Sequence, residues 1–209
     1  MTSAVSQQAS PARSARGEVR RQAFLAAAYD VFIEKGYEAA SVNDVVRIAG
    51  GSLATLYAQF GSKEGLFLAM CEARTQQFMH KLRDITAKHE PLEQGLRRIG
   101  EHYGNTIFDR AHVTFLRILV AHPSIYKRYQ ELAVEPVRAV LRDYLEERKA
   151  LGEVRELDCE WTAHYFIEML RARHQLAVFA DPDHVVTREE CAEHVARAID
   201  LVVNGMRPR

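Results

Sequence analysis

Long apolar segments are missing from this sequence of 209 residues. No apolar run approaches the roughly 18 residues that a membrane-spanning helix needs. The N-terminal stretch MTSAVSQQASPARSARG also lacks the apolar core of a secretory signal. Hydrophobic residues make up 47% of the chain, which is enough to bury a core. We therefore expect a globular cytoplasmic protein that does not act at a membrane.

Cysteine is scarce. Cys71, Cys159 and Cys191 lie far apart, so they provide neither a disulfide framework nor a metal-ligand spacing. Their scarcity suits a reducing compartment. Two interpretations stay open for them, namely buried inert thiols or a redox-sensing thiol.

An excess of charge of one sign is also absent. The chain has 28 Lys and Arg residues against 28 Asp and Glu residues. This balance excludes a bulk polycation of the histone-like kind, so any contact with nucleic acid must come from a local patch.

Catalytic and metal-binding motifs are missing as well. The sequence contains no GxSxG, no phosphate-binding glycine loop, no HExxH and no Cys/His set at catalytic spacing. Several histidines recur every ten residues, as in His174, His184 and His194, but this spacing does not match helical periodicity. We therefore predict no enzymatic activity, no cofactor and no metal site.

Strand signals are lacking throughout, whereas helical periodicity continues to the C-terminus. The predicted fold is all-α with about nine helices. We expect a disordered arm over residues 1–16, a helix-turn-helix domain over 17–64 and a larger helical bundle over 65–209.

The first helix is expected from about Glu18 to Lys35, ended by Gly36. Its predicted inner face consists of Phe24, Ala28, Val31 and Phe32.

The later helices are read from apolar stripes and breakers. Gly100 and Gly104 should let another helix come close, and Pro136 should kink a long helix. The expected helices cover residues 62–90, 92–107, 113–121, 125–151, 158–180 and 187–204, and Ser62 is expected to cap the first of these. Thr187 and Glu190 form a capping box for the last of them.

The stretch SVNDVVRIAGGSLATLYAQFGSK, residues 41–63, predicts two short helices joined by a glycine turn. Ser41 with Asp44 has capping-box spacing, and Ser52 can cap the second helix. In that second helix Leu56 and Phe60 lie one turn apart on an apolar face. A short helix with an apolar back and small or hydrogen-bonding residues in front suits a reader of the DNA major groove.

Many positions between Phe32 and Phe67 stand at characteristic spacing. They are Phe32, Gly36, Tyr37, Ser41, Ala49, Gly50, Ser52, Thr55, Leu56, Tyr57, Phe60, Ser62, Lys63, Glu64 and Leu66. Through these positions the segment resembles the DNA-binding domain of the TetR family of bacterial repressors. The resemblance covers roughly a quarter of the chain; the remainder matches the family in length and helical character.

The DNA contacts that we expect follow from side-chain chemistry and from matching family positions. They are Arg20, Asn43, Ser52, Leu53, Ala54, Thr55, Tyr57, Gln59 and Lys63. The hydroxyls of Thr55 and Tyr57 suit phosphates or base edges, and the amides of Asn43 and Gln59 suit adenine. Tyr57 could instead pack inside the domain, and Asn43 could be a solvated helix residue.

The positive charge in this region is modest. The second short helix has no Lys or Arg, and residues 13–64 contain seven basic and six acidic residues. Lys63 lies in the first turn of a helix, where a bound phosphate would explain a cation. Leu53 and Ala54 could contact thymine methyls, but the family often has a basic residue and glycine there, so specificity at these base pairs stays open.

The apolar residues of the last two predicted helices indicate self-association. Apolar residues between Trp161 and Ala180 cover more than one face, and Ile199, Leu201 and Val203 lie outside the main stripe of the last helix. Either these helices are central to their own bundle, or one face meets a second copy. The family resemblance favours a two-fold dimer through them.

The resemblance also implies a small-molecule effector bound by the C-terminal domain. The pointers to its site are Tyr103, Phe108, Phe115, Arg117, Trp161, His164, Tyr165 and Glu168. Glu168, on a helix expected to be largely buried, could pair with Arg171 or Arg117, or could anchor a ligand.

The combined expectation is a homodimeric transcriptional regulator. It would bind a palindromic, double-stranded DNA operator, repress transcription and be released by an unknown small molecule. The alternative is a helical ligand-binding or adaptor protein that has lost specific DNA binding.

Overall fold

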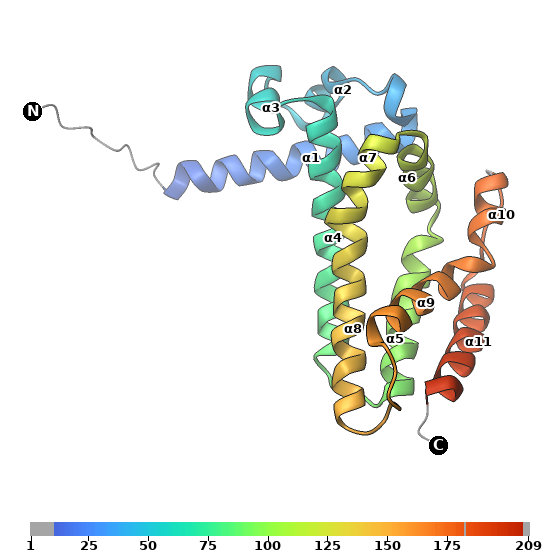
Figure 1. Ribbon diagram of the computed structural model, residues 1–209. Helices are drawn as coiled ribbons and strands as arrows, with labels where there is room; N and C mark the ends of the chain where they lie inside the picture. The colour runs from blue at the N-terminus through green and yellow to red at the C-terminus, as the bar shows by residue number, and fades with distance from the viewer. Residues whose placement is uncertain (1–10, 182, 207–209) are drawn as a thin grey trace, which may run out of the picture. The chain divides into compact units, whose positions relative to one another are not determined.

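The computed structural model describes residues 11–181 and 183–206, with side chains from residue 15 onward. These residues form eleven α-helices and one π-helical turn, and they contain no strand (Figure 1). The all-α prediction is therefore confirmed. None of the helices described is long and apolar enough to cross a membrane. The chain divides into two compact units, Met1–Ala73 and Arg74–Arg209.

Unit 1 contains α1 (Pro11–Ala39), α2 (Val42–Ala49), α3 (Leu53–Phe60) and the start of α4 (Lys63–Thr86). Helix α1 begins seven residues before the expected Glu18, so part of the predicted disordered arm is helical; residues 1–10 lie outside the described residues. Its helical backbone breaks at Gly36, whose positive φ of 75° is accessible to glycine at little cost.

The predicted inner face of α1 is confirmed. Phe24, Ala28, Val31 and Phe32 are all at most 1% exposed. The ring of Phe32 lies edge-on to Phe67 of α4 at 5.0 Å, and Phe24 meets Phe60 of α3 at 6.2 Å. Aromatic contacts of this kind hold α1, α3 and the start of α4 around one core.

The start of α2 differs from the predicted capping box. Ser41 caps the helix, since its Oγ accepts from the Asn43 N–H at 3.1 Å. Asp44 does not bond back to Ser41 because its carboxylate is paired with Lys35 at 2.7 Å and with Arg47 at 3.1 Å. The caps at Ser52 and Ser62 form as expected, through the N–H groups of Thr55 and Gly65.

Unit 2 continues α4 and adds the remaining helices. They are α5 (Leu92–Ile107), α6 (Arg110–Ala121), α7 (Pro123–Tyr129), the π-helical turn η1 (Gln130–Val134), α8 (Glu135–Ala150), α9 (Cys159–Ala172), α10 (Gln175–Ala180) and α11 (Arg188–Met206). The Thr187–Glu190 capping box at the start of α11 is confirmed in both directions, at 2.9 and 3.1 Å.

Two expected helices are interrupted. The helix predicted over 125–151 contains the turn η1 just before Pro136, which lies in the first turn of α8, where its missing N–H is tolerated. The helix predicted over 158–180 breaks at Arg173 and His174 into α9 and α10.

Helix α11 packs closely along α5. A Cβ atom added at Gly100 would lie 2.8 Å from Val195, and one at Gly104 would lie 2.5 Å from the Cys191 sulfur. These glycines therefore permit the close approach that the sequence predicts. Ile199 and Val203 are buried in this core, which corrects their assignment to outer apolar surface; Leu201 alone of the three is exposed, at 66%.

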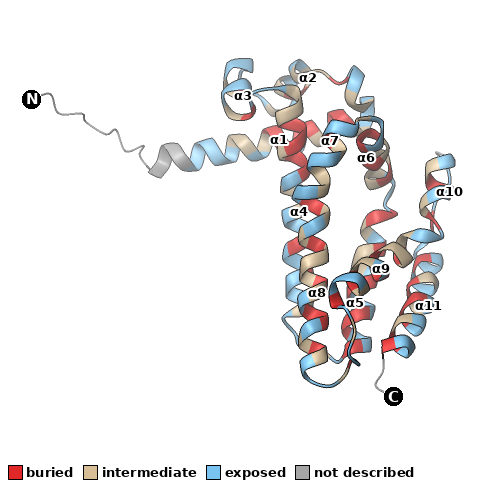
Figure 2. Ribbon diagram, in the orientation of Figure 1, coloured by how far each residue is buried: buried red, intermediate tan, exposed pale blue. Residues whose placement is uncertain are grey.

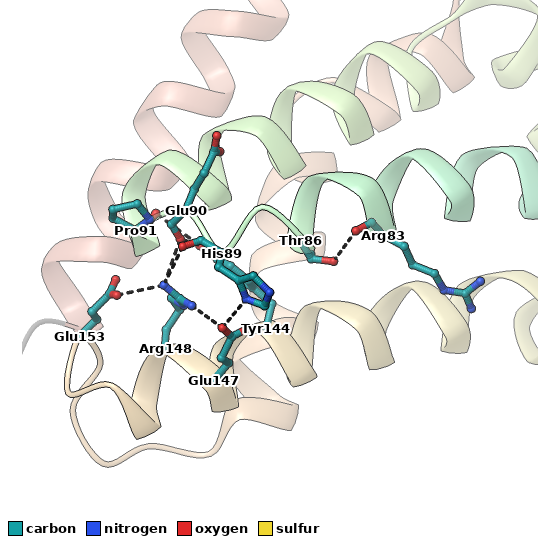
Figure 3. A network of polar contacts seen from close by, with 9 residues as sticks. All are labelled: Arg83, Thr86, His89, Glu90, Pro91, Tyr144, Glu147, Arg148 and Glu153. Carbon is teal, nitrogen blue, oxygen red and sulfur yellow. Dashed lines mark hydrogen bonds and ion pairs between the residues drawn. The ribbon is translucent and has the colours of Figure 1, made fainter.

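A buried arginine joins the α4–α5 connection to the end of α8 (Figure 3). The Arg148 side chain is 3% exposed and contacts the carboxylates of Glu147 at 2.6 Å and Glu153 at 3.0 Å. It also donates to the carbonyls of His89 and Glu90 at 3.3 and 3.2 Å. A buried charge needs such partners, so this network determines how the two segments meet.

We expect Arg148→Met to lower the free energy of unfolding by about 3 kcal/mol, because it removes one partner of a buried ionic network. Arg142→Met is the matched control on α8, since that arginine is 40% exposed and pairs with exposed carboxylates; its change should stay within about 0.5 kcal/mol. Urea unfolding followed by circular dichroism measures both values. Equal losses for the two variants would contradict the assignment.

Candidate functional site

Helix α3 buries one face and exposes the other (Figure 2). Leu56 and Phe60 are 0% and 9% exposed, whereas Leu53 and Tyr57 are 37% and 46% exposed. Ala54 and Ala58 are exposed as well. The face that points to solvent is therefore small and weakly polar, apart from the Tyr57 hydroxyl. Ala58 was missed by the sequence analysis, because a lone alanine gives no chemical signal.

The hydroxyls of Ser52 and Thr55 lie at the start of α3, 2.9 Å apart. Ser52 Oγ also accepts from the Thr55 N–H. Whichever hydroxyl donates to the other, one O–H proton remains free at the helix N-terminus. That proton and the free N–H groups of the first turn suit a phosphate oxygen.

Gln59 does not lie on the exposed face with Tyr57. Its side chain is half-buried, and its Oε1 is enclosed with no hydrogen-bond partner among the described residues. A paired contact to adenine needs both amide atoms at the surface. In this conformation the Gln59 Oε1 is not available to a base, and the contact of Gln59 with DNA stays a prediction.

The two basic residues expected at DNA have partners within unit 1. Arg20 donates to the Ala49 carbonyl at 2.9 Å, where it completes the C-terminal end of α2. Lys63 donates to the Glu38 carbonyl at 3.1 Å and lies 4.7 Å from the centre of the Tyr37 ring. Both cations thus also stabilise the fold, which sequence spacing did not reveal.

Helix α2 adds a second exposed surface. Asn43 is exposed, and so is Ile48 at 52%. The Arg47 side chain is 71% exposed, but its charge is shared with Asp44. Pairing with Lys35 and Arg47 keeps the pKa of Asp44 below its usual value, so its negative charge persists and offsets much of the local positive charge.

The residues expected around an effector fall into two groups. Phe108 and Phe115 are buried in unit 2, at 9% and 4% exposure, and Tyr103 is half-buried. Arg117 belongs with them but bonds to the carbonyls of Val178 and Asp181, at the C-terminal end of α10. Arg117 therefore already serves to hold α10.

The second group lies on the outside of α9, so this face of the helix is not covered by its own chain; its coverage by a second copy stays a prediction. Trp161 and Tyr165 are 56% and 59% exposed and stack at 5.6 Å, with the His164 ring edge-on to Trp161 at 5.7 Å. Glu168 pairs with Arg171 at 3.1 Å, the first of its two suggested partners. The structure thus does not bring these aromatic residues together with Phe108 and Phe115.

Unit 2 also contains polar residues that the sequence analysis left aside. Gln130 on η1 donates to the Tyr126 hydroxyl on α7 at 2.5 Å, and Tyr126 lies close enough to Arg171 to hydrogen bond to it. These residues lie on different helices. Their proximity depends on the π-helical turn and on tertiary packing, neither of which is visible as a sequence motif.

The histidine and cysteine residues give no evidence of metal or redox chemistry. The ring centres of His174 and His194 are 5.2 Å apart, beside a cavity of about 20 Å³. Within the described ranges, no group of three His, Cys, Asp or Glu side chains could hold a metal ion. Burial raises the pKa of all three thiols, that of Cys159 to about 11. Because the thiolate is the reactive form, this favours the interpretation of inert thiols.

Comparison with protein families matches both units. Residues 24–70 match the profile described as bacterial regulatory proteins, tetR family. Residues 94–204, more than half of the chain, match the C-terminal domain of AefR-like transcriptional repressors.

Individual proteins agree with the family profiles. The repressor NicS of Pseudomonas putida is 27% identical over 93% of this chain and 96% of its own. The repressor ComR of Escherichia coli is 41% identical, but over only 34% of this chain and 30% of its own.

Two solved structures have a similar fold. A protein described as a TetR-family regulator from Mesorhizobium loti superposes with a TM-score of 0.85 at 19% identity, over 92% of this chain and 99% of that one. The flavonoid-responsive regulator FrrA gives a TM-score of 0.70 at 26% identity, over 91% and 98%.

The exposed face of α3 can be tested with one negative charge. Ala58→Glu should weaken binding to duplex DNA at least tenfold, roughly 1.4 kcal/mol, because a carboxylate on this face would meet phosphates. Leu151→Glu is the control, because Leu151 is 63% exposed and lies in unit 2. Fluorescence anisotropy measures both affinities. Unchanged binding by Ala58→Glu would show that α3 does not face DNA.

Proposed function

The chain belongs to the TetR family of bacterial transcriptional regulators, and we propose that it is a cytoplasmic repressor that binds a palindromic operator as a homodimer. It is a DNA-binding regulator that responds to a ligand. Repression is favoured by the C-terminal match to a repressor domain and by NicS, a repressor matched over nearly its whole length. In this proposal residues 17–64 bind DNA, and residues 65–209 bind the effector and the partner chain.

The observation that carries the DNA-binding proposal is the outward face of α3 in a helix-turn-helix. Tyr57 and Thr55 offer hydroxyls to the operator backbone, while Leu53 and Ala54 contact thymine methyls. Asn43 on α2 is exposed and carries an intact amide for a base edge. Arg20, Ser52 and Lys63 supply further hydrogen-bond donors at the edges of this face. Gln59 contributes only its Nε2 donor.

Dimerisation is supported by apolar surface near the C-terminus. Trp161 and Tyr165 of α9, Leu176 of α10 and Leu201 of α11 are each more than half exposed. Large apolar residues gathered on the last helices are typical of protein interfaces. One recognition helix also reads too few bases to select a site in a genome, so two copies on a palindrome are expected.

A small-molecule effector is supported by the relatives. FrrA is named for its response to flavonoids, and at 26% identity over nearly its full length it resembles this chain in more than fold. We propose that the effector binds within unit 2, near Tyr103, Phe108 and Phe115. An adaptor protein without DNA binding has no support, because the DNA-binding profile matches over residues 24–70.

The modest local charge predicts a modest salt dependence. With few free cations in unit 1, the log–log slope of affinity against salt should not be steeper than about −8 for the dimer on a palindrome selected from a random pool. Tyr57→Phe and Lys63→Ala should each weaken binding several-fold, as loss of about 1 kcal/mol implies. A steeper slope, or no effect of either substitution at low salt, would contradict the proposed contacts.

The proposed dimer interface can be tested by measuring the mass of the particle in solution. Trp161→Glu combined with Tyr165→Glu should convert the dimer to a monomer in sedimentation equilibrium, because two carboxylates would be buried without partners. Leu132→Glu on η1 is the control at an exposed apolar site away from α9. If the double variant stays dimeric, the interface lies elsewhere.

A further inference from the structure

Polar side chains from five helical segments of unit 2 lie at the edge of its apolar core. They are Tyr103 of α5, Tyr126 of α7, Gln130 of η1, Arg138 of α8 and Arg171 of α9, all half-buried. Arg171, Arg138 and Tyr126 all influence the pKa of the Tyr103 phenol, and Gln130 donates to the Tyr126 hydroxyl at 2.5 Å. We call these five residues the inner polar cluster.

Both arginines of the inner polar cluster have a carboxylate partner that lies nearer to water than they do. Arg171 pairs with Glu168 at 3.1 Å; the two side chains are 17% and 43% exposed. Arg138 pairs with Glu135 at 2.7 Å, and those side chains are 18% and 55% exposed. Solvent screens the outer carboxylates more than the inner guanidinium groups. The interior is therefore positive, although each pair is formally neutral.

The ionisable groups near the cluster respond to this environment. Burial, together with the cations Arg74 and Arg171, lowers the pKa of His112 to about 4, whereas Asp109 opposes this shift. At neutral pH this histidine is uncharged. Burial also raises the pKa of Tyr103 to about 12, with Arg171 and Arg138 opposing the rise and Glu168 and Tyr126 adding to it. Tyr103 consequently keeps its proton and can donate it.

Hydrogen-bond donors in the cluster exceed their acceptors. Arg138 Nε is buried and has no hydrogen-bond partner among the described residues. Arg171 bonds to Glu168 and Gln175 and lies beside Tyr126, which leaves further N–H groups of its five free. An unpaired buried donor such as Arg138 Nε costs about 1–3 kcal/mol. An acceptor with negative charge would satisfy these donors together.

Unit 2 also contributes aromatic rings. Phe78 of α4 meets Tyr103 of the cluster edge-on at 6.2 Å, and a second aromatic pair is formed by Phe115 of α6 and Tyr129 of α7 at 5.5 Å. The cluster also includes the π-helical turn, a feature that is frequent at functional sites. An apolar or aromatic body would fit these surroundings, with its charged group toward the arginines.

We propose that the effector is an organic carboxylate with an apolar body, whose carboxylate is bound by Arg138, Arg171 and the Tyr103 hydroxyl. This inference rests on the proposed function, because it names the chemical class of the effector of that regulator. Glu168 is then the outer counter-ion of Arg171 and makes no contact with the ligand. Charge-assisted pairs between arginine and carboxylate are strong, so the carboxylate should supply much of the affinity.

The test uses matched probes that differ in charge. Benzoate, phenylacetate and octanoate are each compared with their primary amides. Binding is followed by thermal shift and by the fluorescence of Trp161, the single tryptophan of the chain. At least one acid should bind, and its amide should bind tenfold or more weakly, since a hydrogen bond to a charged group contributes about 1.5–3 kcal/mol. An amide that binds as well as its acid would overturn the proposal, as would the absence of binding by all three acids.

Variants locate the site. Arg138→Gln and Tyr103→Phe should each weaken binding of the acid about tenfold while leaving binding of the amide unchanged. Arg142→Gln is the matched control on α8 and should behave as the unmodified chain does. Acid binding that resists both cluster substitutions would also overturn the proposal.

Operator binding is measured separately, without any probe. If the unliganded chain fails to bind a selected palindrome, the proposed regulatory function fails, whereas the carboxylate site is still tested by thermal shift. If the palindrome is bound and a bound acid releases it, both are supported. Release by the amide as readily as by the acid would again contradict the charge argument.

Discussion

The packing of Leu56 and Phe60 into the core of unit 1 is the constraint on which DNA recognition depends. Both side chains are buried, and Phe60 meets Phe24 of α1 edge-on. Because α3 has only eight residues, burying these two fixes its rotation about its own axis. The opposite face, with Ala54 and Ala58 at its centre and Tyr57 at its edge, is then the face that can enter a groove.

Charge in unit 1 is used mostly within the protein. Lys35 and Arg47 share Asp44, Arg20 closes α2, and Lys63 binds the Glu38 carbonyl. Such cations position the two short helices, and they add less to phosphate attraction than free side chains would. We therefore expect a large part of operator recognition to depend on the fit of α2 and α3 to the DNA surface and on contacts made by their uncharged side chains. In unit 2, by contrast, the guanidinium groups of Arg138 and Arg171 are more deeply buried than the carboxylates with which they pair.

Local patterns predicted the all-α fold, the inner face of α1, the caps at Ser52 and Ser62, and the close approach at Gly100 and Gly104. These features depend on residues near one another in sequence or on one helical period. The sequence did not reveal the Arg148 network, the destination of Lys63 or the inner polar cluster, because each needs partners from distant helices. The sequence also left open whether the apolar surface around Trp161 lies in the core or at an interface, since an apolar stripe alone does not tell the two apart.

The most direct measurement compares the affinity and stoichiometry of the chain on a selected palindrome and on one isolated half-site. Two outward α3 helices in one dimer predict two chains per palindrome and binding to the half-site at least 100-fold weaker, roughly 2.7 kcal/mol. One chain per palindrome, with equal affinity for the half-site, would contradict the account.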